Sequence, residues 1–217
     1  KEPLLIFGPK GTRKFLDGVF AMPQFRPGFE IKITEVDAGK KPFFETDLFS
    51  VKCFNVKHNA PAAIGFVLQG LPYKRFDMDK CAKAGVTGRM FSQLQEIGEV
   101  EINKKKVKYG DVTYLQEGKK IVYTGDTMQC ASIATNAKNA DLLIHDSCFL
   151  DKHKDHAKAK MHSTCLGAAQ NAKKAGVKKL ILTHFSNRYD DLTPLLAEAK
   201  TVFENSELAE SGKEVLI

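Results

Sequence analysis

Three apolar, strand-like runs of this chain end abruptly in a histidine or an aspartate. The runs 54–57, 121–124 and 180–182 lead to His58, Asp126 and His184. A buried strand that ends in this way delivers its next polar side chain to the edge of a sheet. Two imidazoles and one carboxylate on three strand ends are donors that suit a zinc-type site. The pattern predicts a metal site built from separate strands.

The same positions belong to a set of ordered motifs. These are His58-Asn-Ala-Pro61, Gly125-Asp126-Thr127, Ile144-His145-Asp146-Ser147, His162-Ser163-Thr164 and Leu182-Thr183-His184-Phe185-Ser186. Each motif is weak alone, but five in this order are specific. On these motifs the chain resembles the tRNase Z family, metallo-β-lactamase-fold endonucleases that trim the 3′ ends of precursor tRNAs. The resemblance runs from Gly8-Pro-Lys-Gly11 to about Tyr189.

The resemblance implies an α/β fold, an αββα sandwich, with two zinc ions per site, although Mn²⁺ or another divalent metal also suits such donors. By the family pattern, His58 binds one metal, Asp126 bridges both and His184 binds the other. His162 is then the general acid for the departing 3′ oxygen, held by an acidic residue that is usually glutamate. Asp146 takes that place here, and because it is one methylene shorter we expect a weaker pairing. His145 is expected to be a packed or capping histidine.

The family's main metal motif, His-x-His-x-Asp-His, belongs upstream of Gly8, and the sequence begins at Lys1 without it. We therefore expect an N-terminally incomplete domain that cannot form the full dinuclear centre. The segment Asp151-Lys-His-Lys-Asp-His156 matches that motif except at its first position. Its interleaved lysines would oppose a second cation, so we interpret it as a solvated basic loop.

The chain has the length of one large domain, and its charge is unevenly distributed. Of the net charge of +7, the stretch 71–120 contributes +4, from eleven lysines and arginines against seven acids. Composition alone would make this stretch a solvated face. The resemblance implies instead an arm that clamps the tRNA elbow, and phosphate contacts of this kind are strongly salt-dependent. The candidate RNA-binding residues are Lys74, Arg75, Arg89, Lys104, Lys105, Lys106 and Arg188.

Hydrophobic periodicity and turn residues predict an alternation of strands and helices. The expected strands are 4–7, 30–36, 48–56, 63–68, 121–124, 141–144 and 180–182, with weak alternation over 99–107. The expected helices are 12–20, 76–84, 91–97, 128–139, 165–175 and 191–203. Gly176 is expected to cap the helix 165–175.

The cysteines and the lengths of the apolar runs indicate the cellular environment of the protein. Five cysteines without a Cys-x-x-Cys motif favour a reducing compartment, so we expect a cytoplasmic protein. No apolar run is long enough to cross a membrane. The resemblance implies precursor tRNA as partner and a homodimer. The alternatives are another metallo-β-lactamase-fold phosphodiesterase or hydrolase, and a non-catalytic RNA-binding fragment.

Overall fold

The computed structural model describes residues 2–22, 27–59 and 62–217. Ala60 and Pro61, the second half of the His58 motif, lie outside these residues. Contacts divide the chain into two compact units, one formed by 1–69 with 119–217 and the other by 70–118. Each unit has its own buried cluster of apolar side chains.

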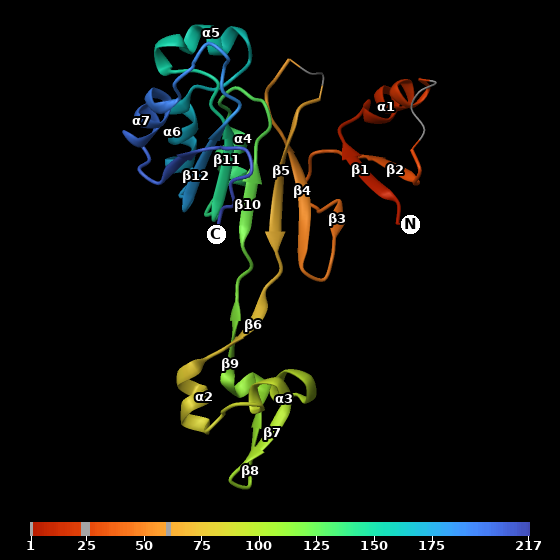
Figure 1. Ribbon diagram of the computed structural model, residues 1–217, viewed down its shortest axis with the longest axis vertical. Coiled ribbons are helices and arrows are strands. Elements are labelled where there is room, and N and C mark those ends of the chain that lie inside the picture. Colours follow the sequence, from red (N-terminus) through yellow and green to blue (C-terminus); the bar gives the residue numbers. More distant parts are fainter. Residues whose placement is uncertain (1, 23–26, 60–61) are drawn as a thin grey trace. The chain divides into compact units, whose positions relative to one another are not determined.

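A seven-stranded sheet organises the larger unit (Figure 1). Its order is β13 (Ser206–Leu208), β12 (Lys179–Thr183), β11 (Leu142–Asp146), β10 (Lys120–Tyr123), β5 (Ile64–Gly70), β4 (Phe49–Asn55) and β3 (Phe44–Glu45). The strands β10 to β13 are parallel, whereas β5 pairs antiparallel with β10. Parallel strands are buried on both faces and therefore read as continuous apolar runs, as Leu180–Leu182 does.

The main core lies between this sheet and the helices that follow its parallel strands. These helices are α4 (Ala131–Asn136), α6 (Cys165–Ala175) and α7 (Thr193–Lys200). Fully buried leucines of β11 and β12 pack with alanines of α6, whose small side chains let the helix approach the sheet closely. The α6 helix starts at the Thr164 cap and ends at Gly176, which has a φ of 64°. Two shorter helical segments precede α6: η2 (Asp151–His153) and α5 (Lys154–Ala159).

A second, parallel pair of strands is formed by β1 (Leu4–Gly8) and β2 (Ile31–Glu35). Between them in sequence lies α1 (Thr12–Phe20). Phe7 of β1 packs against Phe43 and Phe44, with ring centroids 5.0 and 5.5 Å apart. The carboxylate of Glu35 accepts the backbone N–H groups of Gly11 and Arg13 at the start of α1. This carboxylate satisfies backbone donors that the first turn of a helix leaves unpaired.

The unit 70–118 contains two short antiparallel ribbons and two helices. The ribbons are β6 (Tyr73–Phe76) with β9 (Thr113–Gln116), and β7 (Glu99–Ile102) with β8 (Lys105–Lys108). The helices are α2 (Met78–Ala84) and α3 (Met90–Ile97), with the 3₁₀ turn η1 (Tyr109–Val112). Leu94 is fully buried at the centre of the unit's own apolar cluster. This cluster gives the segment a core that is separate from the main sheet.

Most elements lie where the periodicity predicts them, but several bounds and pairings differ. The helix expected over 128–139 is only Ala131–Asn136, and that expected over 191–203 is Thr193–Lys200. The weak alternation at 99–107 is a hairpin, whose turn residues Asn103 and Lys104 both have positive φ. The ribbon β6–β9 was not predicted, because exposed polar strands lack a clear alternation. No helix among the described residues has both the length and the apolar character needed to cross a bilayer.

Candidate active site

The candidate residues gather at one edge of the seven-stranded sheet. Asp146 is the last residue of β11, His184 directly follows β12, and Asp126 comes three residues after β10. The carboxyl ends of parallel strands meet at the same edge, which is where ligands bind in open α/β sheets. Gly125 has a φ of 62° and His184 a φ of 59°, so the segments that follow β10 and β12 turn sharply as they leave the sheet. A left-handed backbone at a histidine carries a strain that is typical of functional sites.

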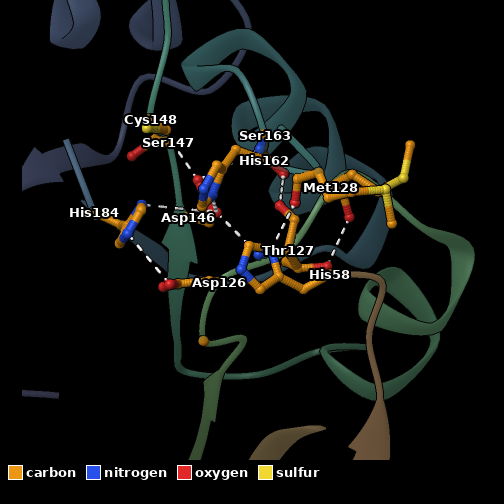
Figure 2. A network of polar contacts seen from close by, with 12 residues as sticks. His58, Asp126, Thr127, Met128, Asp146, Ser147, Cys148, His162, Ser163 and His184 are labelled. Carbon is orange, nitrogen blue, oxygen red and sulfur yellow. Dashed lines mark hydrogen bonds and ion pairs between the residues drawn. The ribbon is translucent and has the colours of Figure 1, made fainter. Parts of the chain in front are cut away.

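Asp146 is the buried centre of the site (Figure 2). Its Oδ2 accepts the N–H of Thr127 at 2.9 Å and Nδ1–H of His162 at 2.7 Å. Its Oδ1 accepts the N–H groups of Cys148 and Ser163 at 3.1 and 3.4 Å. Four donors thus satisfy a carboxylate that would otherwise be costly to bury.

This arrangement fixes the orientation of His162. With Nδ1 bound to Asp146, the other ring nitrogen, Nε2, remains for a ligand or substrate. The ring stacks on His184, with centroids 4.6 Å apart and planes inclined by 20°. Oδ2 of the shorter aspartate reaches Nδ1 of His162 at 2.7 Å. The weaker pairing that we expected from the missing methylene stays a prediction. The predicted acid–base residues are therefore in direct contact.

Asp126 and His184 form the second pair of the site. Oδ2 of Asp126 lies 3.3 Å from Nε2 of His184, and the two side chains are 42% and 39% exposed. Two ligands bound tetrahedrally to zinc at roughly 2.0–2.1 Å lie about 3.3 Å apart. The distance between these two atoms thus fits joint ligation of one cation. Among the described residues, Asp126, Asp146 and His184 form one group whose potential ligand atoms all lie within 4.8 Å of one another.

His58 is oriented by a backbone carbonyl. Its Nδ1 lies 3.1 Å from the carbonyl oxygen of Met161, which accepts the ring N–H. A ring that donates Nδ1–H to a backbone carbonyl presents Nε2 to a ligand, and metal-binding histidines are commonly oriented in this way. The ring of His58 lies 4.9 Å from that of His162. The structure thus brings all five predicted site residues into one cluster: His58, Asp126, Asp146, His162 and His184.

Cys148 is a buried residue that borders the site. Its thiol belongs to a group with ring nitrogens of His162 and His184. Burial, followed by the carboxylates of Asp146 and Asp126, raises the pKa of Cys148 to about 12. In the metal-free site the thiol therefore keeps its proton at neutral pH.

His145 is a packed histidine, as predicted. It is fully buried, its Nδ1 donates to the carbonyl oxygen of Asp146 at 2.7 Å, and its Nε2 accepts from the Asn171 amide at 2.9 Å. Burial lowers the pKa of His145, opposed by the bond to Asp146. Asn171 of α6 thereby supports the backbone that carries the Asp146 carboxylate.

Replacing Asn171 with leucine should destabilise the protein. The substitution leaves Nε2 of His145 buried without a donor, which costs about 1–3 kcal/mol. Urea unfolding monitored by circular dichroism measures the loss. Gln170→Leu is the matched control, because Gln170 is exposed on the same helix and should change stability by less than about 0.5 kcal/mol. Equal unfolding midpoints for the two variants would contradict the role given to Asn171.

The predicted RNA-binding residues are exposed and divide between the two units. Arg188 lies in the larger unit, with its guanidinium 5.0 Å from the ring centre of Phe149, which itself lies 6.4 Å from the ring of His162. The others belong to the unit 70–118: Lys74, Arg75, Arg89, Lys104, Lys105 and Lys106. Of these, Lys74 lies over the ring of Tyr109 and Lys106 pairs with Glu99 at 2.8 Å.

The segment Asp151–His156 contributes no candidate metal donor: among the described residues, none of its side chains belongs to a group of donors that could hold a metal. It forms η2 and the start of α5. Asp151 and Lys154 nevertheless line a pocket that includes His162. The ring of His156 packs on Phe149 and that of His153 lies near Tyr189. The interpretation that this segment is no substitute metal motif stays a prediction.

Three contributions to the site were missed. Thr127 donates its N–H to Asp146 and its hydroxyl accepts the N–H of Lys57, which ties the Asp126 turn to the His58 turn. The carbonyl of Met161 and the amide of Asn171 orient His58 and His145. The Gly125-Asp126-Thr127 motif contained a signal for Thr127, but no sequence pattern marks a backbone carbonyl or a helix residue 26 positions from its partner.

Comparisons with known proteins agree with this arrangement. Residues 75–185 match the family model described as "Beta-lactamase superfamily domain". A protein named ribonuclease Z from Methanosarcina acetivorans is 39% identical over the whole chain, which spans 72% of that protein's length. Another ribonuclease Z, from Ignicoccus hospitalis, is 36% identical, and the chain spans 71% of it.

Two solved structures share the fold. The metallo-β-lactamase-fold protein YhfI from Bacillus subtilis gives a TM-score of 0.64 at 19% identity, with 97% of this chain and 64% of that one covered. The short form of human tRNase Z gives 0.61 at 23% identity, with 97% and 66% covered. The metallo-β-lactamase fold expected from the motifs is thereby confirmed. With relatives of this identity matched along its whole length, the chain belongs to the ribonuclease Z family.

Proposed function

We propose that this protein, provided that the His-x-His-x-Asp-His motif is present on the full protein, is a metal-dependent endoribonuclease that cleaves the 3′ trailer from precursor tRNA after the discriminator base. The observation that carries the proposal is the contact between two pairs of side chains. The Asp146–His162 pair offers a proton donor, and the Asp126–His184 pair beside it offers metal ligands. Hydrolysis of a phosphodiester needs both.

The metallo-β-lactamase fold implies a divalent metal, and we propose zinc held by His58, Asp126 and His184. When bound, the metal would supply a hydroxide nucleophile and offset the charge of the attacked phosphate. Asp126 has two carboxylate oxygens and is therefore suited to a bridging position. Asp146 keeps Oδ2 on His162 and both oxygens on backbone N–H groups, so we assign it to positioning rather than ligation.

His162 would hold the proton that the departing 3′ oxygen needs. Asp146 binds Nδ1 and aligns the ring, which leaves Nε2–H as the donor toward the oxygen. Proton transfer from Nε2 would leave a 3′-hydroxyl on the tRNA. The stacked ring of His184 limits rotation of His162 during this step.

The unit 70–118 is proposed as the arm that binds tRNA. Its exposed cations include Lys104 and Lys105 at the β7–β8 turn, and Lys74 and Arg75 on β6. Such residues bind phosphates largely without reading sequence. We also propose a homodimer, by family resemblance, in the cytoplasm; the five cysteines are free thiols, as a reducing compartment favours.

Removing the unit 70–118 should impair tRNA binding while leaving the hydrolytic chemistry of the larger unit in place. Gln69 of β5 and Lys120 of β10 are paired neighbours in the sheet, so a short turn can join these strands after the deletion. With Zn²⁺ or Mn²⁺ added, the deletion should lower cleavage of precursor tRNA by roughly 10²–10³-fold, because several phosphate contacts are lost. Hydrolysis of bis(p-nitrophenyl) phosphate, which is too small to need these contacts, should change less than about threefold.

A matched variant tests charge without removing the fold of the unit. Replacing Lys104, Lys105 and Lys106 with alanine should reduce tRNA cleavage by about tenfold and flatten its salt dependence. Equal effects of the deletion on both substrates would favour another phosphodiesterase of the same fold. Absence of hydrolysis with any metal, together with retained tRNA binding, would favour a non-catalytic RNA-binding protein.

A further inference from the structure

A small polar pocket of about 250 Å³ adjoins His162. Its walls include Gln129, Thr164 and two lysines of α5, Lys154 and Lys158. In Figure 2, Met128, which also lines the pocket, is drawn on one side of His162 and His184 on the other. The pocket lining thus includes the candidate proton donor His162 but neither Asp126 nor His184.

The pocket is rich in positive charge. Lys154 and Lys158 are four residues apart on α5, so both project from the same face of the helix. Both are exposed, and within the described residues neither ammonium has a carboxylate within 4.0 Å. The one acidic residue in the lining, Asp151, accepts the hydroxyl of Thr164 at 3.4 Å. Two lysines one helical turn apart, with no carboxylate partner among the described residues, favour an anionic ligand.

The helix that carries these lysines is fixed to the site. Ala157, between them, is 2% exposed and packs with Cys148 and Phe149. Its carbonyl oxygen accepts the backbone N–H of His162 at 2.9 Å. The lysines are therefore held at a set position relative to His162, although their side chains can move.

The geometry points to a phosphate-binding subsite for the RNA strand that carries the departing 3′ oxygen. The inference rests on the proposed function. A proton passes from Nε2 of His162 to an oxygen of the strand 5′ to the cut, so that strand must run beside His162. The pocket next to His162 then takes a backbone phosphate of the acceptor end, with Lys154 and Lys158 as its cations.

The cleavage test combines a protein change with a substrate change. The variant is Lys154→Ala with Lys158→Ala, and the control is Lys173→Ala with Lys174→Ala, which removes the same charge from the last turn of α6. The substrate carries one uncharged methylphosphonate, placed one phosphate 5′ of the scissile bond or one phosphate 3′ of it. We expect the variant to lower kcat/KM by about tenfold and the control by less than about twofold.

The substrate arms decide which phosphate is bound. In the parent protein the 5′ methylphosphonate should slow cleavage by about tenfold, and in the variant it should add little, because the contact is already gone. In the variant, the slope of log affinity against log salt concentration should also become shallower, by roughly 0.7 for each single-strand phosphate contact that is lost. If the 5′ methylphosphonate slowed the Lys154/Lys158 variant as much as it slows the parent protein, the subsite would be overturned. The same would hold if the difference in rate between variant and parent disappeared only with the 3′ methylphosphonate.

A binding measurement distinguishes failure of the subsite from failure of the proposed function. Fluorescence anisotropy with a short RNA that ends in a 3′-hydroxyl needs no cleavage and no added metal. The Lys154/Lys158 variant should bind about tenfold more weakly than the parent, and the Lys173/Lys174 control should bind equally. A parent that never cuts precursor tRNA would remove the proposed function. Equal RNA affinity of parent and Lys154/Lys158 variant would remove the subsite.

Discussion

Replacing Asp146 with asparagine should lower cleavage of precursor tRNA by about 10²–10⁴-fold, the usual contribution of a positioned acid or base. The substitution removes the negative partner of Nδ1 of His162. It also presents an amide group to a position where four donors converge on two oxygens. Because the site is buried, we expect a loss of stability of about 3–5 kcal/mol as well. Single-turnover cleavage and urea unfolding measure the two effects separately.

Two further variants keep this result interpretable. Asp141→Asn makes the same chemical change at the residue before β11, where the carboxylate pairs with Lys178, and it should leave cleavage within about twofold. His162→Gln removes the proton donor while leaving Asp146 in place. If Asp146 acts through His162, the double variant should be no slower than the slower single variant. Unchanged cleavage by folded Asp146→Asn would show that the assigned role is wrong.

Replacing Asp126 with alanine should abolish joint metal ligation with His184 and reduce cleavage by at least about 10³-fold. The two ligand atoms lie 3.3 Å apart, so losing the carboxylate removes half of the pair that fits one cation. Isothermal titration with Zn²⁺ measures binding without relying on activity. We expect the Zn²⁺ affinity to fall by more than about 100-fold. Loss of a group that only orients a metal ligand typically costs about 10–100-fold in affinity, and loss of the ligand itself should cost at least as much.

The control for Asp126 comes from the segment that imitates a metal motif. Asp155→Ala removes a carboxylate from Asp151–His156, which forms no donor group among the described residues, and it should leave Zn²⁺ affinity unchanged. The opposite outcome, with Asp155→Ala losing metal and Asp126→Ala retaining it, would move the metal site to the basic loop.

Local sequence was sufficient where each residue's environment is set by its own strand. Leu180–Leu182 is buried on both faces of a parallel strand, so its apolar run and the histidine that follows were readable directly. The same holds for the Gly176 cap of α6, which depends on residues within one helical turn. The exposed ribbon β6–β9 was not readable, because its pairing joins positions about 40 residues apart and leaves no apolar alternation.

By itself, the sequence determined the family, the alternation of strands and helices, and five residues of the candidate site, because strand ends and motif order are properties of the linear chain. Only the tertiary structure decided how these residues act on one another. The 2.7 Å contact of Asp146 with His162, the Met161 carbonyl on His58 and the Asn171 amide on His145 all join distant segments. A hydrogen bond requires a short distance and a suitable angle between donor and acceptor, and the order of residues along the chain specifies neither.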